Sequence, residues 1–173
     1  YAVKMVQFPE EARLDRMLAL NPSRIDLYKR YQEIIAEYNH DKDDAEIQRV
    51  FDDLLKLHDS LDYEEQRYVR EGFKSDKELA VYDLLSKENA SLTKADIDKI
   101  KKVAQELMDT VEKRRHEMGN LRDRASAQAQ MKSAIIDGLL EGMPDTFSSE
   151  EIELRAEIVF QYVQQQMYVA RIH

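Results

Sequence analysis

The sequence of 173 residues contains no cysteine and no tryptophan, and only four glycines and three prolines. Without cysteine the chain can have no disulfide bond, no thiolate nucleophile and no cysteine-based zinc or iron–sulfur site. This lack agrees with a reducing compartment, so we expect a cytoplasmic protein. Because helix-breaking residues are scarce while Leu, Ala, Glu, Lys and Gln are abundant, local propensity favours helix over most of the chain.

Long apolar runs are also missing. The most apolar stretches, such as SAIIDGLLEGM, are interrupted by charge or glycine, whereas a membrane span needs roughly 20 consecutive apolar residues. We therefore expect no contact with a membrane and no secretory signal. The chain opens with YAVKMVQFPEEA and has no initiator methionine, so it is expected to be a segment of a longer protein.

Apolar positions at helical spacing, separated by capping residues, predict an all-α bundle of about eight helices with short connections. Three glycines are expected to end helices: Gly72, Gly119, and Gly142 together with Pro144. Separate third and fourth helices are expected over 47–55 and 61–69, and a later one from about Leu121 to Leu140. Helix starts are expected at Pro9, Asp43 with Glu46, Thr93 with Asp96, and Ser148 with Glu151.

Two features of the predicted helices suit close packing. Ile97, Ile100, Ala104, Leu107 and Val111 alternate in spacings of three and four, which gives a narrow apolar seam for a neighbouring helix. The small-residue stretch ASAQA, residues 125–129, would let another helix approach closely.

The net charge of −9 argues against non-specific binding of the whole chain to a phosphate backbone. The charge is uneven, because residues 99–124 carry eight Lys or Arg against five acids, a local +3, and the remainder carries −12. This basic cluster is the candidate contact with DNA or an acidic protein surface, with an ordinary solvated face as the alternative. Its candidate residues are Lys101, Lys102, Lys113, Arg114, Arg115, Arg122 and Arg124.

No catalytic residue and no metal site is predicted. Glu37 and His40 have the Glu-x-x-His spacing of di-iron bundles, but the second copy that such a site needs is missing. The acidic run from Asp41 lacks the sixth-position glycine of a calcium loop, so a helix cap is the preferred interpretation. No glycine lies in a phosphate-binding loop, which argues against ATP hydrolysis by this segment.

The stretch KELAVYDLLSKENASLTKADIDKIKKVAQELM, residues 77–108, resembles the C-terminal region of the motor (restriction) subunit of type I restriction–modification enzymes. The downstream stretch SAIIDGLLEGMPDTFSSEEIELRAEIVFQYV is similar to that family's closing segment, so the likeness covers roughly residues 75–165. The residues that match the family pattern are Glu78-Leu79-Ala80, Asp83-Leu84-Leu85, Leu92-Thr93, Lys101, Val103, Ala104, Glu106 and Leu107.

The resemblance implies a helical region over residues 1–74 that leads into a C-terminal assembly domain over 75–173, or one continuous domain. It implies a bacterial or archaeal parent subunit that cleaves and translocates DNA with ATP and Mg, while this segment holds no cofactor. The expected partners are the modification and specificity subunits, with DNA reached through the parent complex. The alternatives are a free-standing acidic adaptor that binds a partner helix along the apolar seam, and a metal-dependent helical-bundle enzyme.

Overall fold

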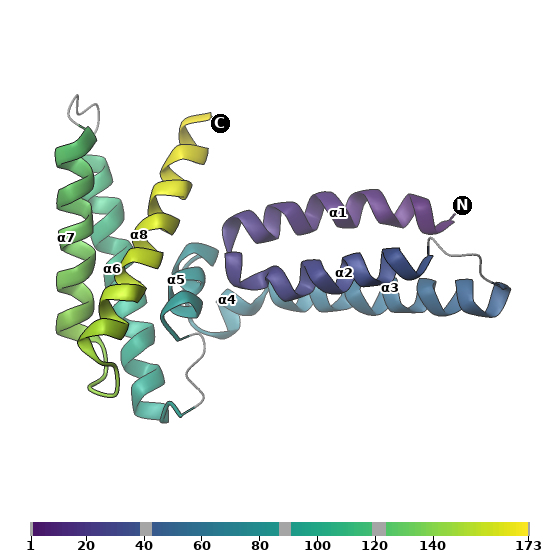
Figure 1. Ribbon diagram of the computed structural model, residues 1–173, viewed down its shortest axis with the longest axis horizontal. Coiled ribbons are helices and arrows are strands. Elements are labelled where there is room, and N and C mark those ends of the chain that lie inside the picture. The colour runs from purple at the N-terminus through teal and green to yellow at the C-terminus, as the bar shows by residue number, and fades with distance from the viewer. Residues whose placement is uncertain (1, 39–42, 87–90, 119–123, 173) are drawn as a thin grey trace. The chain divides into compact units, whose positions relative to one another are not determined.

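The computed structural model describes residues 2–38, 43–86, 91–118 and 124–172. Over these residues the regular structure consists of eight α-helices and one 3-10 turn, which confirms the predicted all-α class (Figure 1). The chain divides into two compact units, Tyr1–Asp76 and Lys77–His173. The assignment of an assembly function to 75–173 stays a prediction.

The first unit contains four of the helices and the 3-10 turn. They are α1 (Ala2–Leu20), η1 (Pro22–Arg24), α2 (Ile25–Tyr38), α3 (Asp44–Glu65) and α4 (Arg67–Arg70). The expected start at Pro9 is wrong, because proline removes only one backbone hydrogen bond and the helix extends back to Ala2. The expected break near residue 60 is also wrong, since Leu57 and Leu61 continue the buried face of α3 at 0% exposure.

The core of the first unit lies between α1, α2 and α3, which run side by side (Figure 1). Its members are apolar or aromatic side chains at helical spacing, which is what amphipathic helices bury. The buried residues are Leu14, Met17, Tyr31, Ile34, Val50, Leu54, Leu57 and Leu61. Burial raises the pKa of the Tyr31 hydroxyl to about 12.

Short-range hydrogen bonds define the start of α3 and the end of α4. The Asp43 carboxylate accepts from the Glu46 backbone N–H at 2.9 Å while the Glu46 carboxylate accepts from the Asp43 N–H at 3.0 Å, which confirms the predicted cap. Gly72 has φ of +84°, and the Phe73 N–H donates to the Tyr68 carbonyl at 2.8 Å. The left-handed residue therefore ends α4, as predicted.

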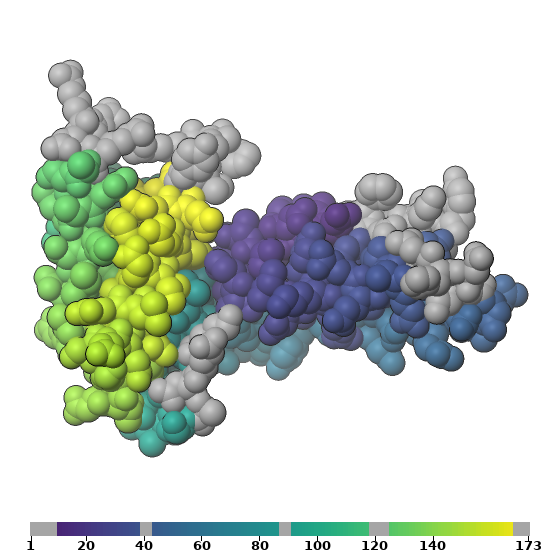
Figure 2. Space-filling model, viewed as in Figure 1, coloured from purple at the N-terminus to yellow at the C-terminus, as the bar shows by residue number. Residues whose placement is uncertain are grey.

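The second unit is built from α6, α7 and α8, with α5 against them. Their bounds are α5 (Asp76–Ser86), α6 (Lys94–Met118), α7 (Arg124–Gly142) and α8 (Ser149–Ile172). Figure 2 shows the surfaces of α7 and α8 lying side by side along this unit. Arg155 of α8 donates from Nε to the Leu85 carbonyl of α5 at 2.8 Å, which fixes these two helices together. The expected stop at Gly119 and start at Leu121 lie outside the described residues.

The apolar seam of α6 is filled by the second unit itself. Ile100, Ala104, Leu107 and Val111 are 0–3% exposed, so this seam is part of the core and is closed to a partner helix. Close approach of α6 and α7 occurs at Gly138 and Gly142, where an added Cβ would meet Leu107 and Val103. The prediction that residues 125–129 would supply this approach is wrong, because that stretch is mostly exposed.

Candidate functional site

The basic cluster does not converge on one surface. Consecutive helical residues point about 100° apart, so Lys113, Arg114 and Arg115 face three directions. Lys102 lies 3.8 Å from Glu106, and both side chains are well exposed. Lys101 instead lies over the ring of Tyr82 on α5, 5.9 Å from its centroid.

Of the remaining predicted contact residues, Lys113 is exposed and Arg114 is partly buried. Arg122 and the side chain of Arg124 lie outside the described residues. The described part of the cluster is thus a set of charges spread around α6, several of them beside acids or an aromatic ring. Its role as a DNA or partner contact stays a prediction.

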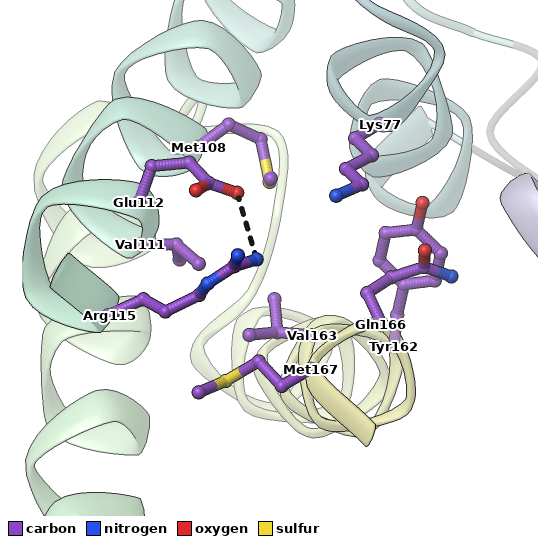
Figure 3. A pocket seen from close by; sticks show the side chains of 9 residues that line it. All are labelled: Lys77, Met108, Val111, Glu112, Arg115, Tyr162, Val163, Gln166 and Met167. Atoms are coloured by element: carbon purple, nitrogen blue, oxygen red, sulfur yellow. Dashed lines mark ion pairs between the residues drawn. The ribbon is translucent and has the colours of Figure 1, made fainter. Parts of the chain in front are cut away.

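Arg115 lines a surface hollow in the second unit, together with residues of α5 and α8 (Figure 3). α6 contributes positions 108, 111, 112 and 115, and α8 contributes 162, 163, 166 and 167; both sets recur on one helical face. The lining residues are Lys77, Met108, Val111, Glu112, Arg115, Tyr162, Val163, Gln166 and Met167.

The floor of this hollow is part of the packed core. Met108, Val111, Tyr162 and Val163 are between 2% and 6% exposed, so neighbouring side chains hold them in place. Met167 and Gln166 are partly exposed and form one edge. The hollow is therefore a preformed, mostly apolar depression.

Charged groups lie around the rim. Arg115 Nη1 is 3.8 Å from Glu112 Oε1, an exposed pair whose charges nearly cancel (Figure 3). Lys77 lies across from them, is partly buried, and has no ion-pair partner among the residues that the structure describes. The sequence did not point to Lys77, because no local pattern connects a lysine at the start of α5 with a hollow lined mainly by α6 and α8.

The size of the hollow limits what it can hold. It encloses a volume of about 10 Å³, which is roughly what a single water molecule needs. A nucleotide would not be enclosed here.

A second group of charged residues lies in the first unit, between α1 and α3. Arg13 Nε donates to Glu65 Oε1 at 2.9 Å and its Nη2 donates to Glu65 Oε2 at 3.0 Å, while Nη2 also pairs with Asp62. The bidentate contact with Glu65 raises the pKa of Arg13 and lowers the pKa of Glu65. The partners are about fifty positions apart, so no sequence pattern joined them.

Glu10 is the buried member of this group. It is 4% exposed, and its Oε1 lies 2.5 Å from His58 Nδ1. Its Oε2 has no hydrogen-bond partner among the described residues. The hydrogen bond with Glu10 raises the pKa of His58 above its ordinary value of 6.5. The free-energy cost of burying a carboxylate with one oxygen left without a hydrogen bond depends strongly on whether its histidine partner is charged.

We expect the first unit to lose stability as pH rises above about 6.5, the ordinary pKa of histidine. The pKa of His58 is raised by folding, so its contribution is complete below the unfolded value near 6.5 and is lost as pH passes the folded value. Thermal unfolding of the chain against pH, with the pKa of His58 measured by NMR, checks this. In Glu10→Gln this part of the pH dependence should disappear; an unchanged profile would show that another group causes it.

Acid has the opposite effect on the carboxylates of this group. The pKa values of Asp62 and Glu65 are lowered by Arg13, so their contribution is present above pH 3.8 to 4.5 and is lost below. The group as a whole is most stabilising between these two limits.

The other candidates give no site among the residues that the structure describes. Within the described ranges, no cluster of three or more His, Asp or Glu side chains could hold a metal ion. His40 and the first residues of the acidic run, Asp41 and Lys42, lie outside those ranges. Among the described helices, none is long and apolar enough to cross a membrane.

The fold defines the class of protein as an all-helical domain of two compact units. The chain belongs to the family described as type I restriction enzyme HindI endonuclease subunit-like, C-terminal, whose pattern matches residues 13–167. The match spans both units and confirms the resemblance seen in the sequence. It identifies a C-terminal domain of a type I restriction enzyme subunit, in the setting of a multisubunit restriction–modification enzyme. Searches of curated proteins and of solved structures gave no significant match.

Proposed function

We propose that this domain is the non-catalytic end of the motor subunit and joins it to the modification and specificity subunits. The observation that carries the proposal is the family match over residues 13–167, which places both helical units at the C-terminus of an endonuclease subunit. Among the residues that the structure describes, no group of three or more His, Asp or Glu side chains could hold a metal ion. DNA cleavage and ATP- and Mg-dependent translocation then belong to other parts of the parent subunit.

A deletion tests the assembly role. Removing residues 13–167 from the full-length motor subunit should abolish its co-elution with the methyltransferase core in gel filtration, because the contact surface is lost. Binding of a fluorescent ATP analogue to the shortened subunit serves as the control for folding of the remaining domains. Full assembly of a shortened subunit that still binds nucleotide would contradict the proposal.

The free-standing adaptor is the second candidate, and the structure removes its main support. The adaptor hypothesis placed a partner helix on the apolar seam of α6, but most of this seam is already buried inside the second unit. Family membership favours the motor-subunit assignment. The upstream reading frame discriminates the two, because a helicase-length extension supports only the first.

A further inference from the structure

We propose that the outer face of α8 binds an amphipathic helix of a subunit of the methyltransferase core, with basic side chains of that helix meeting the acids at the start of α8. This inference rests on the proposed function, because it specifies the surface and the chemistry by which the domain would hold its partner. The outer face is the row of exposed side chains that α8 turns away from its own unit, Leu154, Ile158, Gln161 and Gln165.

Two large apolar side chains on this face have no core to cover them. Leu154 is 61% exposed and Ile158 is 40% exposed. They are four positions apart, so they are neighbours on the helix surface. The opposite face of α8 is already packed into the second unit through Ala156, Val159 and Val163. α8 is therefore apolar on two opposite sides, whereas a helix at the surface of a domain needs only one apolar face.

The second half of α8 lacks charge in a chain that is rich in it. Residues 158–170 contain no Asp, Glu, Lys or Arg, whereas these four residue types make up 35% of the sequence. Burial does not explain this lack, because Ile158, Gln161 and Gln165 are exposed. In Figure 2, α8 lies at the surface of the second unit beside α7. Depletion of charged residues distinguishes the centre of a protein–protein interface from ordinary surface.

The spacing of the outer face fits a helix as its partner. Its four residues follow one another at intervals of four, three and four positions, the pattern by which two helices pack along a narrow seam. From the first to the last the row spans about 17 Å, or roughly three helical turns. The partner helix would place apolar side chains against Leu154 and Ile158, and groups that hydrogen-bond against the amides of Gln161 and Gln165.

Charge complementarity selects the residues that flank the apolar anchors of the partner. Glu150 and Glu151 are exposed at the start of α8, beside the outer face. The nearest cations are engaged within the unit, because Lys132 pairs with Glu157 at 2.7 Å and Arg155 donates to a backbone carbonyl of α5 at 2.8 Å. One end of the face is therefore negative, which favours a partner helix with basic side chains at that end. The phosphates of DNA would be repelled by the same acids.

Substitution of Leu154 tests the apolar part of the contact, by titration of the full-length motor subunit onto the methyltransferase core. We expect Leu154→Gln to weaken binding about tenfold, because an apolar anchor of the contact is lost. Leu140→Gln is the matched control, since Leu140 on α7 is 56% exposed and lies outside the outer face. The control should bind within about twofold of the natural subunit. Equal binding of the two variants would overturn the inference.

Substitution of the acids tests the basic character of the partner. Glu150→Gln with Glu151→Gln removes two charges at nearly constant side-chain size. We expect this double variant to bind about fivefold more weakly at about 50 mM salt and much less so at about 500 mM salt, because the contact is electrostatic. Glu117→Gln with Glu141→Gln is the control, because it removes two exposed charges from α6 and α7. Acid variants that bind as tightly as this control would contradict a basic partner.

The tests separate failure of this inference from failure of the proposed function. If deletion of residues 13–167 abolishes assembly while the α8 variants assemble normally, the domain docks through another surface and the inference is wrong. If the deletion has no effect, the proposed function itself is wrong. A photo-crosslinking residue at position 161 should label a helix of a core subunit that carries basic residues. Labelling of DNA or of a second copy of the motor subunit would contradict the assignment.

Discussion

Replacing Arg24 with Met is expected to lower the free energy of unfolding of the first unit by about 3 kcal/mol, since removing one partner from a buried ion pair leaves an uncompensated charge. The Arg24 side chain is 2% exposed and makes three contacts. Its Nε donates to Glu64 at 3.1 Å, its Nη2 to Asp76 at 2.8 Å and its Nη1 to the Met17 carbonyl at 3.2 Å.

The loss should fall mainly on Asp76. Without Arg24, Glu64 would still be paired with Arg67, whose Nε lies 2.9 Å from Glu64 Oε2. In the described structure, the ion-pair partner of Asp76 is Arg24. The double variant Arg24→Met with Asp76→Asn should therefore recover part of the stability, because the stranded charge is removed as well.

Urea unfolding followed by circular dichroism measures the effect of Arg24→Met. Arg30→Met is the matched control, because Arg30 is exposed and makes one long contact of 3.4 Å with Ser60. The control should change stability by less than about 0.5 kcal/mol. Equal effects of the two substitutions would show that the buried network contributes no more than a surface arginine.

Gly142→Ala is expected to destabilise the second unit by about 2 kcal/mol, within the range for overpacking a core. An added Cβ would lie 2.5 Å from Cγ2 of Val103, which cannot rotate freely because its side chain branches at Cβ. α6 and α7 must then separate or Val103 must leave its rotamer.

Gly138→Ala provides the control in the same helix. Its Cβ would lie 3.2 Å from Cδ1 of Leu107, the end of a flexible side chain that can move by a few tenths of an ångström. The gain in helix propensity, about 1 kcal/mol, should leave this variant as stable as the natural chain or more so. Equal thermal stability of Gly142→Ala and Gly138→Ala would contradict the close packing of Gly142 against Val103. Adding Val103→Ala to Gly142→Ala should relieve the clash and restore part of the stability.

The sequence by itself determined the features that depend on residues close together in the chain. Scarce glycine and proline with helical apolar spacing determined the all-α class, and the cap of α6 forms as predicted, with Thr93 and Asp96 exchanging two hydrogen bonds of 3.1 Å. A cap needs only three residues and local backbone geometry, so its signal is complete within a short stretch. The family pattern over 77–108 is built from such capping and packing residues, which explains why it was recognisable.

Only the tertiary structure decided the features that join distant residues. Arg24 is buried and His58 reaches Glu10 because α1, η1 and α3 pack together across 40 to 48 positions of sequence. Lys77 meets the apolar faces of α6 and α8 for the same reason. The cations of α6 are close in sequence but point to different sides of the helix. Hydrophobic spacing tells which face of a helix is buried, but the partner of a charged side chain depends on how the faces meet.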